Sequence, residues 1–439
     1  MDFSAWVGLS CFFGMFALVM LGVPIFVSML VMAFVGFWLI GGPGLAFQQF
    51  GSAPYFVSAS YMLAVIPLFI LMGTIAGTTG IAKSSYDAVT KWVGGLRGGT
   101  LIATVLAGAL FGACCGLGVA SAAVFASLAL PELQKQKYNR SVSMGAICLS
   151  GSLSGLIPPS IGIVIIAILT EQSIGRALVA LIIPGALLAL CASVAIWLMG
   201  IINPKAIPKA AVQTGWKEKL LALRLIWPVL FLFIVVIGGM YLGIFPPTVA
   251  GAIGAAGVLV YAGVLRLSMR TIAQGFQETI LVNAQLFPLV LSGFIFARFI
   301  AISGLPRNLT DLITTAGLSP YSLMLVIVVL YLIIGSVFEF LSMAIVTFPL
   351  IFPILVDAGF DPIAVLIIIS LLGEMAALTP PIGLSAFVVA GVARTRPEEV
   401  FRGIIPFFLI GLALLWLIVF FPQIATWLPN LFYGAASSY

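Results

Sequence analysis

Two proline pairs in matching surroundings give the first indication of chemistry in this sequence. Pro158–Pro159 follows a run of serines that ends at Ser154, and Pro380–Pro381 directly follows Thr379. A proline inside a helix removes a backbone hydrogen-bond donor and disturbs the preceding turn, which leaves carbonyl oxygens without a partner. Such carbonyls and the neighbouring hydroxyls are oxygen ligands of the kind that hard cations prefer. The pattern favours an alkali-cation site at each pair over the alternative, a simple kink between packed helices.

The composition places these prolines inside a membrane. Of the 439 residues, 62% are hydrophobic and only 7% are charged, whereas soluble proteins carry roughly 25% charged residues. A membrane-spanning helix needs about 20 apolar residues, and the chain has many stretches of that length. Within hydrocarbon, irregular backbone survives only where it is buried in protein or lines a cavity. We therefore expect the lipid bilayer to be the solvent for most of the chain.

The same composition excludes several classes of function. The chain has no histidine, which removes the commonest metal ligand and the usual general base. The five cysteines show no C-x-x-C spacing, so neither a disulfide framework nor a zinc site is expected. The 19 Lys and Arg residues lie between apolar stretches and act as topology signals, not as a nucleic-acid patch. We expect no enzyme activity, no cofactor, no transition metal and no nucleic-acid partner.

A single offset relates the two proline pairs to the rest of the chain. Pro380 lies 222 positions after Pro158. The same offset joins Pro24 to Pro246, Pro131 to Pro353 and Gly151 to Gly373. Weak internal similarity of this kind is typical of proteins built from two related units. We therefore expect two homologous halves, residues 1–202 and 225–439.

Each half is expected to hold five spans and one re-entrant hairpin. The hairpins lie at about 99–134 and 320–356, where each segment is long enough to enter the membrane and return. Lys and Arg flank the first hairpin on both sides, which places both of its ends in the cytoplasm, whereas the second hairpin lacks this bias. Because five crossings is an odd number, the halves must be inverted. Both chain ends lack Lys and Arg, so we expect both termini outside, on the non-cytoplasmic side of the membrane.

These expectations define the fold class as an all-α polytopic membrane protein with two inverted repeats, an organisation typical of secondary transporters. Segments 141–170 and 363–393 are too long for one straight helix and contain the proline pairs, so we interpret them as broken helices that meet the hairpin tips. The stretch 203–224 is rich in lysine and contains Trp216. It is either an amphipathic helix on the cytoplasmic surface or a plain linker.

The hairpin tips supply candidate groups for an anionic solute. Backbone amides at a tip, together with helix N-termini, can hold a negatively charged group. The candidate substrate-binding residues are Cys114, Cys115, Gly116 and Ser160 in the first half, and Ser336, Glu339 and Pro381 in the second. The cysteines are expected to serve as small packing residues, because no base that could activate a thiol is near in the sequence.

Two acidic residues stand within apolar segments, where a charge is costly and usually functional. Glu339 lies in the second hairpin, and Glu374 lies just before the second break. Either carboxyl group could take a proton or a cation. The alternatives are a structural ion pair, for instance with Arg298, and a carboxyl group kept neutral by burial. Arg298 lies near the outer end of its helix, where its side chain could extend to the membrane interface.

Several motifs in this sequence resemble those of a known family. They are IPLFILMG at 66–73, GIAKSSYDAVTKWVGGLRGG at 80–99, GSLSGLIPPSIG at 151–162, YLIIGSVFEF at 331–340, FDPIAV at 360–365 and GEMAALTPPIG at 373–383. In this set of motifs the chain resembles the large membrane subunit of tripartite ATP-independent periplasmic (TRAP) transporters. Two departures stand out. The first tip has Cys114–Cys115–Gly116 where the family often has Ser and Gly, and Glu339 stands where Asp is common.

The resemblance implies an elevator mechanism, in which a domain that contains the hairpins slides against a scaffold, driven by a sodium gradient. It implies a bacterial inner-membrane location, a separate small membrane subunit, and a periplasmic binding protein that delivers an organic acid. It also implies sodium ions as the coupling ions. The candidate sodium-binding residues are Gly335, Val337, Gly373 and Thr379 in the second half, and Pro158 and Ser154 in the first.

Our leading hypothesis is sodium-coupled uptake of a carboxylate-bearing solute. Proton coupling through Glu339 is the alternative among transporters. A scaffold or channel subunit without coupled transport is a further class, which the paired hairpins and breaks disfavour because a passive pore needs neither.

Overall fold

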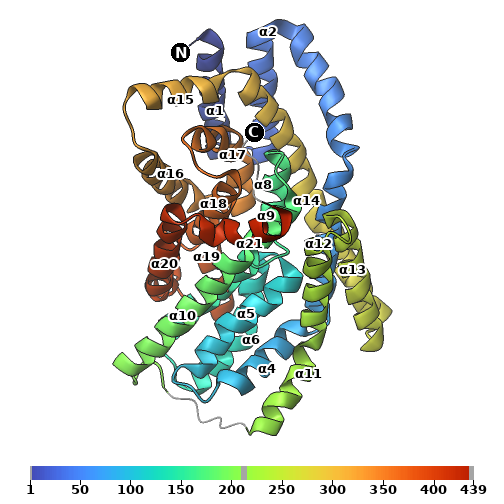
Figure 1. Cartoon of the computed structure of the whole chain (residues 1–439), viewed down its shortest axis with the longest axis vertical. Helices are drawn as coiled ribbons and strands as arrows, with labels where there is room; N and C mark the ends of the chain where they lie inside the picture. Colours follow the sequence, from blue (N-terminus) through green and yellow to red (C-terminus); the bar gives the residue numbers. More distant parts are fainter. Residues whose placement is uncertain (1, 209–214, 435–439) are drawn as a thin grey trace.

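Helices make up the whole of the described fold (Figure 1). The computed structural model describes residues 2–208 and 215–434, and in these ranges it contains no strand. Nine helices in this part are long and apolar enough to cross a membrane, or up to ten if α7 (Arg140–Leu156) and α8 (Ile161–Leu169) form one bent span. The prediction of an all-helical polytopic membrane protein is confirmed.

The chain begins with two long helices and a short return. The first elements are α1 (Phe3–Met20), α2 (Ile25–Ser58), the 3₁₀ turn η1 (Tyr61–Ala64), α3 (Val65–Thr78) and α4 (Ile81–Val93). Helix α2 is 34 residues long, more than a single straight crossing needs. It bends at Gly42, whose φ of 72° suits glycine, and Pro43 then starts a second helical stretch, where its missing N–H group costs nothing.

The next elements form a helical hairpin and a broken helix. The hairpin consists of α5 (Gly99–Cys115) and α6 (Gly118–Lys135), which are joined at Gly116 and Leu117. Helices α7 and α8 follow and bend by 44° at the first proline pair. The segment then continues as α9 (Ile174–Ala180) and α10 (Ile182–Ile202).

Helix α11 starts at Trp216, before residue 225, where the second half of the chain was expected to begin. Helix α11 spans Trp216–Phe233 and continues through the π-helical turn η2 (Ile234–Gly238) into α12 (Gly239–Tyr241). Residues 216–224, which fall within the predicted linker 203–224, therefore form the start of a long helix. Residues 209–214 of that linker, including Lys209, lie outside the described residues.

The remaining helices have a similar order of hairpin and break. They are α13 (Pro247–Val264), α14 (Met269–Ile302), α15 (Leu305–Thr315), α16 (Pro320–Gly335), α17 (Phe340–Asp357), α18 (Pro362–Ala376), α19 (Leu384–Ala393), α20 (Pro397–Phe420) and α21 (Gln423–Tyr433). Helices α16 and α17 pack against each other as the second hairpin. The second proline pair lies between α18 and α19.

Helices α7 and α18 lie at the centre of the protein. Every residue from Ser143 to Leu156 in α7 and from Ile363 to Ala376 in α18 is buried. Helix α7 packs against α5, α6 and α20, while α18 packs against α16, α17 and α20. A helix that is buried on all sides needs close neighbours on every face. The two helices that lead into the proline breaks are thus held rigidly by the hairpins.

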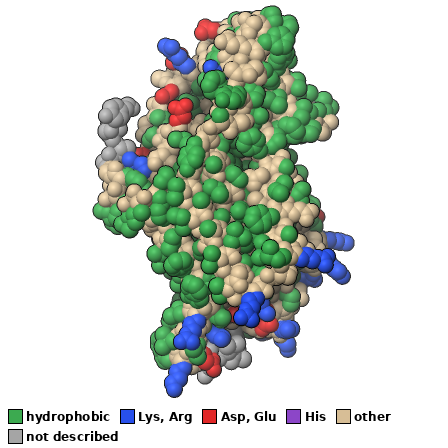
Figure 2. All heavy atoms as spheres, turned by 90° about the vertical axis from the view of Figure 1, so that its right-hand side faces the viewer, with side chains coloured by type: hydrophobic (Ala, Val, Ile, Leu, Met, Phe, Trp, Pro, Cys, Tyr) green, Lys and Arg blue, Asp and Glu red, His purple; other side chains and the backbone are tan. Residues whose placement is uncertain are grey.

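The surface is divided into an apolar middle and charged ends. Figure 2 shows a face whose middle is mostly hydrophobic, with most of its visible Lys and Arg side chains in the lower half. The lower end in Figure 1 carries α4 and the start of α11, and the upper end carries α1 and α15. An apolar belt between polar ends is the surface that a bilayer requires.

Candidate functional site

Small residues let helices α5 and α7 approach closely. Gly108 and Gly112 in α5 face Ser150 and Ser154 in α7, one turn apart on each helix. A methyl group added at Gly108 would stand 2.5 Å from Ser150 Cβ, and one added at Gly112 would stand 2.5 Å from Ser154 Cα. This small-x-x-x-small pairing brings the backbones into contact, as is common between membrane helices. It fixes the first hairpin along the broken helix.

The tip of the first hairpin rests on the first proline break. Gly116, at the turn, has a φ of +64°, and a methyl group there would overlap the carbonyl oxygen of Pro159. Its position would also lie 3.6 Å from the backbone nitrogen of Ile161. The predicted site residues Cys114 and Cys115 lie directly before this turn and are buried. The sequence analysis expected the hairpin tip to meet the first proline break, and in the structure the two lie in contact.

The hydroxyl of Ser154 is engaged by protein atoms. Its Oγ lies 2.6 Å from Ser121 Oγ on α6, and it donates to the carbonyl oxygen of Gly108 at 2.8 Å. Both hydroxyls are buried, where an unpaired hydroxyl is costly. Ser154 thus joins both limbs of the hairpin to the broken helix. As a cation ligand it could offer only the oxygen lone pair that these bonds leave free.

The tip of the second hairpin lies at the second break. The backbone N–H of Gly383 donates to the carbonyl oxygen of Ser336 at 2.9 Å. A methyl group at Gly335 would stand 2.6 Å from Ala376 Cβ, close to the end of α18. The Thr379 hydroxyl donates to the carbonyl oxygen of Ala376 at 2.7 Å, so its oxygen keeps an acceptor lone pair. The predicted ligands Gly335, Thr379 and their neighbours are thus brought together.

Glu339 caps the second limb of that hairpin. Its Oε2 accepts from the backbone N–H groups of Leu341 at 3.0 Å and Ser342 at 3.3 Å. A carboxylate at a helix N-terminus is stabilised by these N–H groups and by the helix dipole. Within the described ranges the single ion pair joins Lys135 and Glu132, so Arg298 forms no ion pair with Glu339.

Phe340 joins the second hairpin to both broken helices. A methyl group at Gly162 in α8 would overlap the Phe340 ring, and one at Gly373 in α18 would do the same. The ring is 7% exposed. One aromatic side chain thus fills the space between the two breaks and requires glycine on both sides, a role that the sequence interpretation missed.

Glu374 reaches from α18 to the elements of the first break. A methyl group at Gly155 would overlap its Oε1, and one at Gly118 would stand 3.0 Å from its Oε2. The Ser152 hydroxyl donates to the backbone carbonyl of Glu374 at 3.3 Å. The side chain is 7% exposed. The sequence singled out Glu374 but not this contact, because it joins residues far apart in the chain.

The two breaks differ in their exposure. Pro158 and Ser160 are buried in the first break, whereas Pro381 is exposed in the second. Val337, at the tip of the second hairpin, is 40% exposed. The second break is therefore exposed at the protein surface, while the first break is covered by packed helices.

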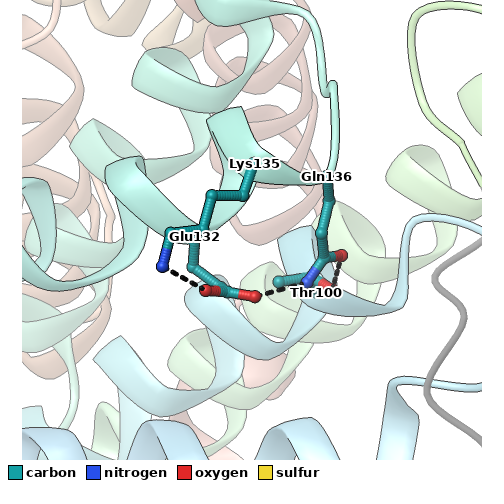
Figure 3. Close-up of polar contacts among 4 residues, drawn as sticks. All are labelled: Thr100, Glu132, Lys135 and Gln136. Atoms are coloured by element: carbon teal, nitrogen blue, oxygen red, sulfur yellow. Dashed lines mark hydrogen bonds and ion pairs between the residues drawn. The ribbon is translucent and has the colours of Figure 1, made fainter.

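The open end of the first hairpin is tied together by polar side chains (Figure 3). Thr100 Oγ1, at the start of α5, donates to Gln136 Oε1 at 2.7 Å, and Gln136 Nε2 donates to Glu132 Oε1 at 2.9 Å. Lys135 Nζ lies 3.8 Å from Glu132 Oε2, and the two side chains are 76% and 43% exposed. A surface ion pair of this kind contributes little to stability. The hydrogen bonds of Gln136 are therefore the main link between the two ends of the hairpin.

The described residues hold no cluster suited to a transition metal, since no group of three or more His, Cys, Asp or Glu side chains comes together there. The oxygen atoms at the two breaks are carbonyls, hydroxyls and carboxylates, which suit hard cations such as sodium. Among the residues that the sequence did not single out, Ser121 and Phe340 contribute to the site. The G-x-x-x-G spacing of Gly108 and Gly112 was the one available signal for this packing.

The sequence is similar to known transport proteins. A family model described as "Tripartite ATP-independent periplasmic transporter, DctM component" matches residues 12–424. The chain is 32% identical over 381 residues to the C4-dicarboxylate TRAP transporter large permease protein DctM of Pseudomonas aeruginosa, a match that covers 85% of this chain and 87% of that protein. It is 29% identical over 427 residues to the ectoine/5-hydroxyectoine TRAP transporter large permease protein UehC of Ruegeria pomeroyi, which covers 96% and 98% respectively.

The fold is similar to that of a solved transporter. The crystal structure of the YdaH transporter of Alcanivorax borkumensis matches with a TM-score of 0.66 and 14% sequence identity, over 91% of this chain and 98% of that chain. At this level of identity the similarity concerns the fold alone.

Proposed function

This chain belongs to the DctM family of tripartite ATP-independent periplasmic transporters, and we propose that it moves an organic acid into the cell together with sodium ions. The observation that carries the proposal is that each hairpin tip meets a proline break: Gly116 lies on Pro159, and Gly383 donates to Ser336. Each meeting gathers carbonyl and hydroxyl oxygens in a chain with almost no intramembrane charge. Such an environment suits a sodium ion more than a divalent cation, because few carboxylates are present.

The sodium ligands proposed for the second break are the oxygens of Gly335, Val337, Gly373 and Thr379. The acceptor lone pair that the Thr379 hydroxyl keeps supports this assignment. For the first break we propose oxygens of Pro158 and Ser154. The organic acid then binds between the tips, where its carboxylate meets tip amides and helix N-termini. Cys115, Gly116, Ser160 and Ser336 line this position, with Cys114, Glu339 and Pro381 beside it.

We also propose that the chain consists of two inverted repeats and works as an elevator. The spacing of the helix starts supports the repeats: α5 and α16 start 221 positions apart, and α6 and α17, like α7 and α18, start 222 positions apart. In this scheme both hairpins and both broken helices move as one transport domain. Helices α1–α3 and α11–α14 form the scaffold. The contacts of Phe340 and Glu374 across the two breaks support a domain that moves as one body.

The proposed orientation places the basic end in the cytoplasm. The end that carries α4 and the start of α11 is rich in Lys and Arg, which favours the inner side of a membrane. Both termini then face the periplasm, and the protein lies in the bacterial inner membrane. Its proposed partners are a small membrane subunit and a periplasmic binding protein that delivers the substrate.

The substrate class that we propose is a small organic acid. Two of the relatives are named for C4-dicarboxylates and for ectoine, and the first of these is the more similar to this chain. The tips of the hairpins offer amide groups to a carboxylate, but the second break is lined by the apolar side chains Val337 and Ile382. A compact acid with one apolar face fits this lining.

Uptake into proteoliposomes tests the proposal directly. The chain is reconstituted with its small partner, the binding protein is added outside, and uptake of a labelled C4-dicarboxylate is measured at fixed pH with and without an inward sodium gradient. Uptake that requires both the gradient and the binding protein is expected. Uptake that is indifferent to sodium would overturn the coupling assignment.

A single substitution makes the test specific to the second break. Thr379→Val keeps the shape of the side chain but removes the hydroxyl oxygen, so the sodium concentration for half-maximal uptake should rise about tenfold, equivalent to about 1.4 kcal/mol. Thr314→Val is the matched control, because the Thr314 hydroxyl makes the same kind of bond to its own helix, to Thr310, on the exposed helix α15. An unchanged sodium dependence in Thr379→Val would remove this residue from the ligand set.

Proton coupling is the alternative that a specific observation supports. Glu339 and Glu374 both lie within the apolar region, and neither forms an ion pair in the described ranges. Glu339→Gln separates the two mechanisms. If uptake keeps its sodium dependence and loses only its pH dependence, the carboxylate carries protons and is not a sodium ligand.

A further inference from the structure

A large apolar cavity lies between four helices, away from the two breaks. It has a volume of about 930 Å³ and is lined by α4, α5, α10 and α11. Ser193 contributes the one hydroxyl among the wall residues, and it donates to the carbonyl oxygen of Ala189 at 2.7 Å. Apart from this hydroxyl and the indole N–H of Trp197, the side chains of the wall are apolar. These helices lie together in the lower part of Figure 1.

The cavity opens toward the surroundings of the protein. Its wall residues Leu190, Trp197 and Leu230 are 58%, 42% and 38% exposed. Helices α10 and α11 are both apolar enough to span a membrane, so these side chains face hydrocarbon. An apolar cavity in this position is filled by lipid chains, because contact of its apolar wall with water is unfavourable.

One end of the cavity is aromatic and basic. Trp92 at the end of α4 and Trp216 at the start of α11 contact each other edge to face, with ring centroids 6.3 Å apart. Lys219 Nζ lies 5.4 Å from the Trp216 ring centroid. Arg97 follows the wall residue Leu96, and a methyl group at Gly200 in α10 would stand 3.4 Å from its Cβ. Tryptophan and lysine together are typical of the membrane interface.

The balance of charge at this end is positive. The described basic residues of the two segments that meet here are Lys83, Lys91, Arg97, Lys217, Lys219 and Arg224, and the acidic ones are Asp87 and Glu218. None of these residues forms an ion pair within 4.0 Å in the described part of the chain. Clusters of Lys and Arg at the end of a span attract anionic lipid head groups.

We propose that this cavity binds an acyl chain of an anionic phospholipid, whose phosphate head group lies against Arg97 and Lys219. The apolar wall takes the chain, and the basic end takes the charge of the head group.

The position of the cavity connects the lipid to the first break. Ile157 is part of the wall and directly precedes Pro158. On the opposite side, the wall is formed by Val229 and Phe233 of α11. The acyl chain therefore contacts both the broken helix and the helix that the proposed function assigns to the scaffold. Resting on that proposed function, the lipid would fill the space between the two proposed domains.

Lipid binding is measured by native mass spectrometry of the purified, delipidated full chain, titrated with phosphatidylglycerol or with phosphatidylcholine of the same acyl chains. One phosphatidylglycerol should bind about tenfold more tightly than phosphatidylcholine. The double substitution Arg97→Gln and Lys219→Gln should abolish this preference. The matched control is Lys137→Gln, since Lys137 lies at the turn after the first hairpin, outside the cavity.

A second variant tests the apolar part separately. Ala186→Trp fills the cavity from an exposed wall position and should weaken the binding of both lipids about tenfold. Val326→Trp, on the exposed face of α16, is its control, and Ala186→Leu replaces it if the tryptophan variant is not monodisperse. Equal binding by the wild type of both lipids, or unchanged binding by the filled variant, would overturn the proposal. Because no transport is measured, these outcomes are independent of sodium coupling.

Discussion

The carboxyl group of Glu374 lies so close to Gly155 that a single added methyl group would overlap its Oε1 atom. The two residues belong to α18 and α7, the helices that lead into the second and first proline breaks. Gly118, at the start of α6, faces the same carboxyl group from the hairpin side. This contact sets the distance between the two broken helices, and it exists only because positions 118 and 155 carry no side chain.

The substitution Gly155→Ala should therefore impair transport. The new methyl group must displace the Glu374 carboxyl group in a closely packed region, and overpacking of this kind costs about 1–3 kcal/mol. We expect a lower melting temperature in detergent and an uptake rate reduced about tenfold.

The control for this experiment is Gly77→Ala. Gly77 lies within helix α3, and a methyl group there meets nothing within 4 Å. Alanine is favoured over glycine in a helix by up to about 1 kcal/mol, so this variant should be as stable as the wild type or slightly more so. Equal behaviour of Gly155→Ala and Gly77→Ala would show that the Glu374 contact does not limit transport.

The class of fold could be predicted because its signals are local. High hydropathy with few charges specifies spans, and the two proline pairs specify where helices end: α7 stops at Leu156, two residues before Pro158. Membership of the family could be predicted from the motifs around those pairs. These features depend on residues near one another in the sequence.

Other features could not be predicted because they depend on contacts between distant segments. The Phe340 ring needs glycine at positions 162 and 373, and no local sequence pattern predicts this requirement. Helix α11 starts at Trp216 because its basic first turns continue smoothly into an apolar span, so the composition alone suggested a separate linker. In both cases the three-dimensional structure was needed to identify the feature.

Phe340→Ala should destabilise the second hairpin. The ring is nearly buried between α8 and α18, and removing a buried phenylalanine ring costs about 3–5 kcal/mol. Phe340→Leu should cost less, because it refills part of the space. Thermal unfolding in detergent compares the two variants with Phe3→Ala, whose side chain is 69% exposed. A melting temperature of Phe340→Ala equal to that of Phe3→Ala would contradict the bridging role.

Gln136→Ala should loosen the open end of the first hairpin. The substitution removes the hydrogen bonds from Thr100 and to Glu132 (Figure 3), and each such bond is worth about 1 kcal/mol. Hydrogen exchange in α5 and α6 should accelerate near residues 99–103 and remain unchanged near the tip. Lys135→Ala is the comparison, because its exposed ion pair should contribute less. Exchange that rises equally in both variants would assign the effect to charge and not to Gln136.

Gly116→Ala should weaken sodium binding at the first break. The variant Gly317→Ala separates the effect of the lost contact from that of backbone strain. Two effects act at this position: the backbone has a φ of +64°, and the added methyl group overlaps the carbonyl oxygen of Pro159. Gly317 has a φ of +66° and nothing within 4 Å, so Gly317→Ala imposes the backbone strain of about 1–2 kcal/mol without the contact. If the tip positions the carbonyl of Pro159 and its neighbours for an ion, only Gly116→Ala should raise the sodium concentration for half-maximal uptake, while Gly317→Ala should lose only the stability that the backbone strain costs. A shift of the same size in both variants would mean that strain, and not the contact between the tip and the break, governs the sodium response.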